Sequence, residues 1–325
     1  MILPNYPFRI EFELLSTCNL DCVYCYAKPF SNFTPSFDNI SYLFKKTAEV
    51  KPFEVVLLGG EPFIRKDVLD IIEFANDTFK HGVGISTNGT MLKRLSEEDL
   101  SRLKLLINEG KNNIQVSIDS LNSNINDSIR GKTLESLKGI KTLDENGIQF
   151  SVGIVLTKAN KTDVSSTINA LLSDFKNLRG INLEPLQPTL TLGSSYKNLK
   201  LNFNEMVKIY KEALSIRNNK ARNIVRIDGV IDSCYNNKTT PLLNEYKFGK
   251  CTAGLLRSGV LVNGDVTPCL TIRDEVLGNL YSESWEAIWA RSKERYLSLE
   301  MEGGQCKLNL LRTEQKEKLK SLSRG

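Results

Sequence analysis

Three cysteines lie close together near the start of the chain, in the segment CNLDCVYCY at residues 18–26. Cys18, Cys22 and Cys25 are soft sulfur donors, which favour zinc or iron–sulfur clusters. A structural zinc site closes its coordination with four ligands, and no fourth Cys or His stands near these three. Three thiolates on a cubane cluster leave one iron open for a substrate or cofactor. The spacing therefore favours an iron–sulfur cluster, and a structural zinc knuckle is the alternative.

Four further motifs each follow a short apolar run that we expect to be a strand. They are LLGGEP (57–62), STNGT (86–90), VSIDS (116–120) and LEPLQP (183–188). Barrel active sites are built at the carboxyl ends of strands, so these motifs are expected to gather around one site. Glu61 supplies a carboxylate there, and two glycines before it allow the backbone to approach a ligand closely.

The cysteine spacing, with Tyr24 just before the last Cys, resembles the signature of radical S-adenosylmethionine (SAM) enzymes. The four strand-end motifs are similar to landmarks of that family, in the same order, and the resemblance covers about residues 8–200. It implies a 4Fe-4S cluster on Cys18, Cys22 and Cys25, whose fourth iron binds the amino and carboxylate groups of SAM. The residues that the resemblance assigns to the cofactor are Tyr24, Gly59, Gly60, Glu61, Pro62, Asn88, Ser117 and Asp119.

In that family, one electron from the cluster cleaves SAM to methionine and a 5′-deoxyadenosyl radical, which abstracts hydrogen from the substrate. That chemistry belongs to the cofactor, and the protein supplies binding, orientation and exclusion of competing reactions.

A second cysteine set begins with Cys251, twelve residues, Gly264, four residues and Cys269. This order resembles the opening of SPASM and twitch domains, which bind auxiliary iron–sulfur clusters in radical enzymes. The longer cysteine run that follows in SPASM domains is missing, and only Cys306 in EGGQC remains. We therefore expect one auxiliary 4Fe-4S cluster and no second one.

Two alternatives exist for the fourth ligand of this auxiliary cluster. Cys234 is the one cysteine left, and its separation from Cys251 is longer than the family pattern. Either Cys234 completes a closed cluster, or it is a small buried apolar residue and the cluster keeps an open iron. We expect ligation, because sets of three and four thiolates then account for all seven cysteines.

Charge and composition exclude several classes. The formal net charge is +5, and residues 307–325 alone hold four Lys, two Arg and two Glu, which leaves about +1 for the rest. So small a net charge on the body of the chain does not indicate a basic surface for nucleic acid. No window is apolar enough for a membrane span, and the start of the chain does not resemble a secretory signal. An odd cysteine count argues against a disulfide framework, so we expect a cytoplasmic protein.

Apolar runs alternate with helical patterns up to about residue 190, which predicts an α/β fold with a parallel sheet. Six such units predict a partial (β/α)6 TIM-like barrel rather than a closed eight-stranded one. Asn263-Gly264 predicts a hairpin with a type I′ turn in the auxiliary region. The predicted domains are a barrel at 1–200, a helical connection at 201–224, a SPASM/twitch-like domain at 225–310 and a basic tail helix at 311–325.

The resemblance implies a radical SAM oxidoreductase or maturase that modifies a peptide or protein, by oxidation, thioether formation or epimerisation. The alternative is a twitch-type small-molecule dehydrogenase or a cofactor-biosynthesis enzyme. The chain starts directly on the barrel, so a peptide would need a separate recognition protein or another docking surface. An electron donor such as flavodoxin or ferredoxin is a further expected partner.

Two other classes explain less of the sequence. A non-catalytic electron carrier accounts for the cysteines but not for GGEP, and a zinc-stabilised module leaves the first three cysteines without a partner. Candidate bases are Asp228, Asp265, Asp274 and Tyr26, and none is assigned as catalytic.

Overall fold

One continuous sheet forms the centre of the computed structural model, which describes residues 5–28, 32–189, 191–219, 225–227 and 252–297. Its ten strands run in the order β10-β9-β8-β1-β2-β3-β4-β5-β6-β7. The strands β1 to β7 are parallel to their neighbours and follow chain order. The strands are β1 (Arg9–Glu13), β2 (Glu54–Leu58), β3 (Gly84–Thr87), β4 (Asn113–Ser117), β5 (Phe150–Leu156), β6 (Leu178–Pro185), β7 (Val225–Ile227), β8 (Arg257–Val260), β9 (Asp265–Thr267) and β10 (Gly278–Asn279).

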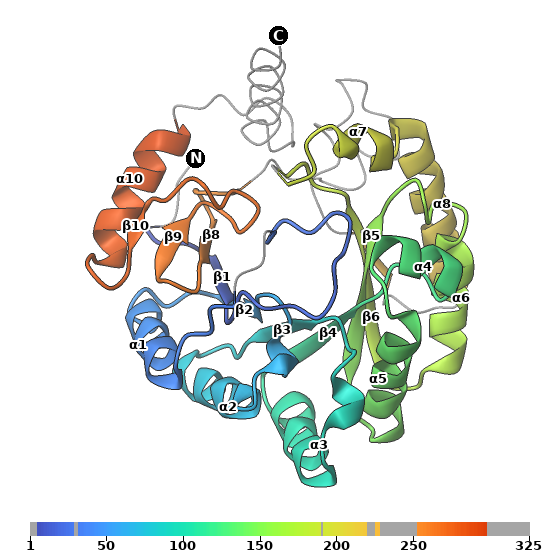
Figure 1. Ribbon diagram of the computed structural model, residues 1–325, viewed down its shortest axis with the longest axis horizontal. Coiled ribbons are helices and arrows are strands. Elements are labelled where there is room, and N and C mark those ends of the chain that lie inside the picture. The colour runs from blue at the N-terminus through green and yellow to red at the C-terminus, as the bar shows by residue number, and fades with distance from the viewer. Residues whose placement is uncertain (1–4, 29–31, 190, 220–224, 228–251, 298–325) are drawn as a thin grey trace.

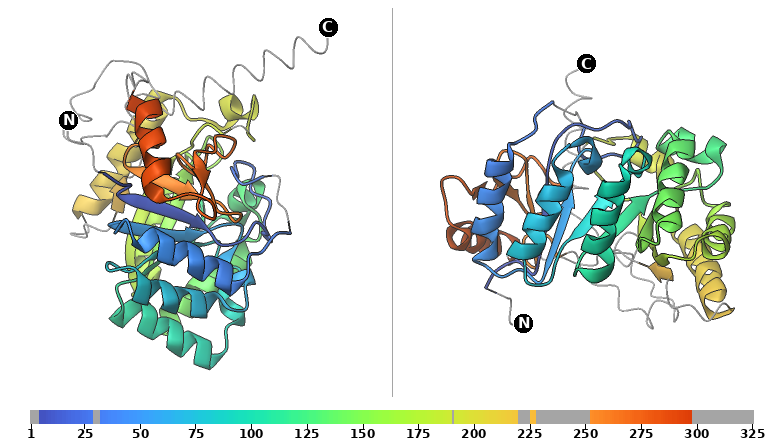
Figure 2. Two further views of the ribbon diagram at one scale, coloured as in Figure 1. Left: turned by 90° about the vertical axis from the view of Figure 1, so that its left-hand side faces the viewer. Right: turned by 90° about the horizontal axis from the view of Figure 1, so that it is seen from below.

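Helices follow the strands and cover the outer side of the curved sheet (Figure 1). The view from below in Figure 2 shows them side by side along one face. The α-helices are α1 (Phe37–Ala48), α2 (Val68–Thr78), α3 (Glu97–Lys104), α4 (Ser123–Ile129), α5 (Thr133–Glu145), α6 (Val164–Asp174), α7 (Ser195–Leu199), α8 (Phe203–Asn219) and α10 (Trp285–Leu297). Two short 3-10 helices, η1 (Pro62–Ile64) and η2 (Leu92–Arg94), and a π-helical turn η3 (Leu105–Glu109) complete the set. The predicted open partial barrel is confirmed.

Strand β1 shows how the sequence separates the two faces of the sheet. Successive side chains of a strand point to opposite faces. Ile10 and Phe12 are buried in the main core, where the Phe12 ring meets Phe44 of α1 at 4.9 Å between centroids. Glu11 lies on the other face and accepts a hydrogen bond from Arg9. The outer face is therefore apolar beneath the helices, while the inner face carries charge.

The auxiliary region continues the barrel sheet. Strand β8 pairs in parallel with β1, with Arg9 opposite Arg257 and Phe12 opposite Val260. Strand β7 pairs in parallel with β6 at the opposite edge of the same sheet. The division of the chain into barrel and auxiliary domain stays a prediction.

The predicted hairpin is present, but its turn differs from the prediction. Strands β8 and β9 are antiparallel, with Gly259 opposite Thr267. A type I′ turn requires positive φ at both central positions. Gly264 has φ of +82°, but the φ of Asn263 is not positive. Leu261 N instead donates to Asp265 O at 2.8 Å, so a longer connection closes the hairpin.

None of the helices in the described part of the chain combines the length and the apolar character that a bilayer crossing requires.

Candidate functional site

The GGEP segment packs directly against the chain that leads into the cysteine loop. Gly60 N donates to Leu15 O at 2.8 Å, and Glu61 N donates to Thr17 O at 2.9 Å. A Cβ atom on Gly60 would lie 1.8 Å from Thr17 O, and one on Gly59 would lie 2.6 Å from Leu15 O. Approach to this chain therefore explains both glycines, and a direct contact of either with SAM stays a prediction.

Replacing Gly60 by Ala is expected to destabilise the protein by about 3 kcal/mol, near the upper end for overpacking. The clash is with backbone, which cannot rotate away as a side chain can. Gly84→Ala is the matched control, because its nearest neighbours would be side-chain atoms, Asn113 Oδ1 at 3.3 Å and Val56 Cγ2 at 3.6 Å. Urea unfolding of both variants measures the difference. Equal stability of the two variants would contradict the packing explanation.

Glu61 is fully buried and joins the ends of two strands. Its Oε1 accepts from Phe63 N at 3.0 Å and from Thr87 Oγ1 at 2.6 Å, while Oε2 accepts from Asn88 N at 2.6 Å. Burial raises the pKa of the Glu61 carboxyl, and these three donors oppose the rise. The described contacts thus fix the carboxylate at the carboxyl ends of β2 and β3. Pro62, also buried, begins η1 immediately after it.

Asn88 connects the STNGT turn to the cysteine loop. Its side-chain Nδ2 donates to Asn19 Oδ1 at 2.9 Å and lies 4.0 Å from Cys18 Sγ. Its Oδ1 accepts from Thr90 Oγ1 at 2.7 Å, and Asn19 Nδ2 donates back to the same threonine at 2.8 Å. Asn88 therefore holds the first turn of the loop beside the site.

Asp119 lies at the centre of a buried network beyond strand β4. Its Oδ2 accepts from Tyr24 OH at 2.5 Å, and its Oδ1 accepts from Val155 N at 2.9 Å. Arg130 donates to the Tyr24 hydroxyl and lies 3.7 Å from Asp119 Oδ1. Burial raises the pKa of Tyr24 well above its usual value, so the phenol stays protonated and donates. Ser117, the last residue of β4, is partly buried close by in sequence.

Arg130 was not among the predicted site residues. It follows α4, a helix that the sequence patterns did not predict. Its backbone carbonyl accepts a hydrogen bond from Cys22 Sγ at 3.9 Å. Its Nε is buried and has no hydrogen-bond partner among the residues that the structure describes. The surrounding sequence SIRGK gives no signal, because an Arg after a short helix usually lies in solvent.

The three thiols of the loop influence one another's pKa values electrostatically. Cys22 is buried, and Cys18 and Cys25 are partly buried. In the described residues, no three Cys, His, Asp or Glu side chains are arranged to hold a single metal ion. A single zinc ion needs its sulfurs to converge at about 2.3 Å from one point, whereas a cubane cluster bonds each thiolate to a different iron. The donor set and its burial fit the cluster.

Burial raises the pKa of Cys18 to about 11 and raises the pKa values of Cys22 and Cys25 as well. The thiolate is the reactive form, so Cys18 of the metal-free protein should react with iodoacetamide at pH 8 about 100-fold more slowly than a thiol of pKa 9. The rate should rise about tenfold per pH unit until pH 11. Mass spectrometry of the alkylated peptide measures this. A plateau reached near pH 9 would contradict the raised pKa.

One predicted auxiliary ligand lies in the described part of the chain. Cys269 is buried just after β9, with its Sγ 3.0 Å from Thr271 Oγ1. Cys234, Cys251, Cys306 and the predicted tail helix lie outside the described residues, so their roles stay predictions.

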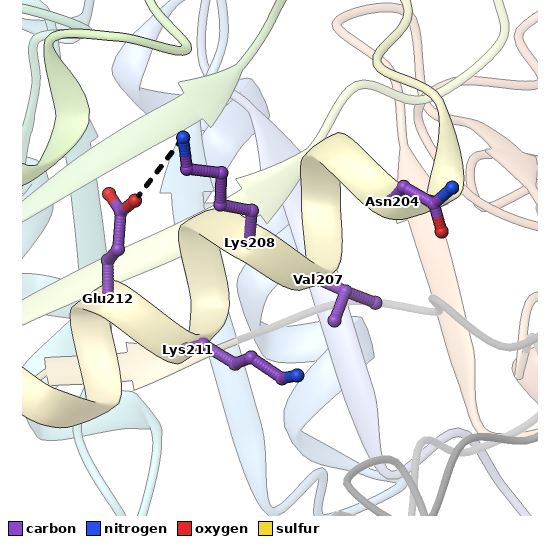
Figure 3. A pocket seen from close by; sticks show the side chains of 5 residues that line it. All are labelled: Asn204, Val207, Lys208, Lys211 and Glu212. Carbon is purple, nitrogen blue, oxygen red and sulfur yellow. Dashed lines mark ion pairs between the residues drawn. The ribbon is translucent and has the colours of Figure 1, made fainter.

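A recess along α8 lies apart from these motifs. Figure 3 shows its lining, in which Lys208 reaches Glu212 while Lys211 points away. The five lining residues all belong to α8, and none is a predicted site residue; they are Asn204, Val207, Lys208, Lys211 and Glu212. None of the residues that line this recess belongs to the cysteine loop.

Comparisons with known proteins agree with this geometry. Residues 12–171 match the model of the radical SAM superfamily, and residues 251–312 match the SPASM model, described as an iron-sulfur cluster-binding domain. The sporulation killing factor maturation protein SkfB of Bacillus subtilis is 27% identical over 310 residues, which cover 93% of this chain and 68% of that protein.

Two further matches are a sequence relative named for a nucleotide reaction and a solved structure that contains a peptide. A probable GTP 3′,8-cyclase of Methanocaldococcus jannaschii is 26% identical over 274 residues, covering 82% of this chain and 86% of the relative. The crystal structure of Streptococcus suis SuiB bound to precursor peptide SuiA has a TM-score of 0.72 at 16% identity, covering 95% of this chain and 74% of that one. The structural match supports the fold.

The two matched domains imply 4Fe-4S clusters and SAM as cofactors. When bound, these cofactors supply a carbon-centred radical that removes hydrogen from a substrate. The chain's own contribution is to hold one buried and two partly buried thiols beside the strand ends, where Glu61, Asn88 and Asp119 make the connecting hydrogen bonds.

Proposed function

Because this chain is a radical SAM protein with a C-terminal SPASM-type domain, we propose that it is a maturase that modifies a peptide or protein. The observation that carries the proposal is the likeness to SkfB, a maturation protein, over 93% of this chain. The SuiB structure, which contains a precursor peptide, has the same fold. Oxidation, thioether formation and epimerisation are the candidate modifications.

The proposed site assigns separate tasks to the described residues. Cys18, Cys22 and Cys25 hold the first cluster. Glu61 and Asn88 tie the strand ends to the loop, so that the loop keeps one geometry when the cofactor binds. Tyr24, held by Asp119, limits access of water beside Cys25. Asp119, Ser117 and the GGEP backbone line the side on which the cofactor is proposed to lie.

A small-molecule substrate is the second candidate. The probable GTP 3′,8-cyclase aligns with 82% of this chain and 86% of its own length, so both barrel and auxiliary regions contribute to the similarity. In this alternative the barrel interior would take a nucleotide-sized molecule rather than a peptide segment.

One experiment separates the two candidates. The reconstituted protein is incubated anaerobically with SAM and dithionite, and with either a pooled library of synthetic peptides or GTP. Peptide maturation predicts that one or more peptides accelerate 5′-deoxyadenosine release and change mass. Acceleration by GTP, with no effect of the peptides, would replace the proposal by the small-molecule alternative.

A further inference from the structure

A buried ion pair joins the barrel to the auxiliary region. Both carboxylate oxygens of Glu13 accept from Arg273, at 2.8 and 2.9 Å, and Oε2 also lies 3.4 Å from Val262 N as an acceptor. The Glu13 side chain is 1% exposed and the Arg273 side chain 25% exposed. Bidentate pairs of this kind fix the relative orientation of two groups as well as their distance. One barrel carboxylate therefore receives donors from two places in the auxiliary region.

Each member of the pair lies close in sequence to one of the two cysteine sites. Glu13 ends β1, five residues before Cys18, and Arg273 follows Cys269 by four residues. Strand β8 pairs with β1 alongside, so the auxiliary region is attached to this strand by backbone as well as by side chains. Figure 1 shows β8 and β9 next to β1.

Arg273 also acts on the first cysteine loop. Burial disfavours its charged form, but the hydrogen bonds and negative charge of Glu13 outweigh burial and raise the pKa of Arg273, so it stays charged; Tyr26 and Cys25 interact with it electrostatically to a smaller extent. Tyr26 interacts in turn with Glu11 and Glu13. Arg273 therefore adds its positive charge to those of Lys28 and Arg130 near the loop, and Glu11 and Glu13 add negative charge.

We propose that Glu13 and Arg273 are positioning residues that fix the auxiliary region beside Cys25 and set, through their opposite charges, the reduction potential of the cluster on Cys18, Cys22 and Cys25. This inference rests on the proposed function, since it requires that cluster. Reduction adds negative charge to a cluster, and nearby charge is one of the factors that set its potential. Arg273 therefore favours the reduced state, and Glu13 opposes it.

The test is an anaerobic redox titration of reconstituted holoenzyme, followed by electron paramagnetic resonance of the signal that changes when SAM is added. Arg273→Met is expected to lower the reduction potential by about 59 mV, which corresponds to a tenfold change in the one-electron equilibrium constant. Glu13→Gln is expected to raise the potential. The double variant, which removes both charges, should return towards the wild-type value.

Two variants separate charge from geometry and from general effects. Arg273→Lys keeps the charge but not the bidentate contact, so its potential should stay near wild type while amide exchange in β8 becomes faster. Lys161→Met removes a positive charge from an exposed pair between the turn before α6 and Glu205 of α8, and should leave the potential unchanged.

The outcomes distinguish this inference from the proposed function. Shifts of the same sign in Arg273→Met and Glu13→Gln, or no shift relative to Lys161→Met, would overturn the role of the pair while leaving the radical chemistry intact. A wild-type protein that forms no SAM-responsive cluster would overturn both.

Discussion

Replacing Cys18, Cys22 and Cys25 together by Ala is expected to abolish formation of 5′-deoxyadenosine from SAM. The three thiols are the only cysteines in the described part of the barrel, and no other described group there offers soft ligands in their place. Bound iron should fall by about four atoms per chain, from about eight for two cubane clusters.

Val23→Ala is the control for this experiment, because Val23 lies in the same loop and is 44% exposed. It should keep both iron and activity. Circular dichroism checks that the triple variant still folds. Retained cleavage of SAM by a folded triple variant would place the site elsewhere in the molecule.

Replacing Asp119 by Asn is expected to cost about 3–5 kcal/mol of unfolding free energy, the range for breaking a buried ion pair by removing one partner. Asp119 is fully buried, and the Arg130 side chain beside it is 11% exposed. The substitution leaves the guanidinium without its countercharge and replaces an acceptor of the Tyr24 hydroxyl by an amide. Denaturant unfolding measures the loss.

Asp70→Asn is the matched control, since it breaks the exposed pair between Asp70 and Arg102. An exposed pair contributes at most about 1 kcal/mol, so this variant should be close to wild type. A loss in Asp119→Asn no larger than that of the control would show that the buried network does not stabilise the site.

The parts of the fold that sequence patterns predicted were those with strong local periodicity. Strand β2 coincides with the apolar run in EVVLL, and α5 with a stretch of helical apolar period, because both patterns are local signals. Helix α4 was missed, since its short polar sequence SNINDSI shows no apolar stripe. The turn at Gly264 was predicted with the wrong geometry, because tertiary contacts select among turn types.

The residues of the site also fall into those that a local pattern reveals and those that it does not. The cysteines and strand-end motifs are recognisable because their residue types are rare at that spacing. Arg130 and the pair of Glu13 with Arg273 are long-range contacts between segments 100 or more residues apart, and no local pattern encodes them. The two glycines before Glu61 were interpreted as allowing the backbone to approach a ligand closely, and no local pattern indicated that they also lie against the backbone at Leu15 and Thr17.

The most direct test of the central claim is an assay for 5′-deoxyadenosine with anaerobically reconstituted wild-type protein, dithionite and SAM, without any substrate. We expect slow release of 5′-deoxyadenosine from protein that holds about eight iron atoms per chain. Protein that binds this iron and releases none would contradict it.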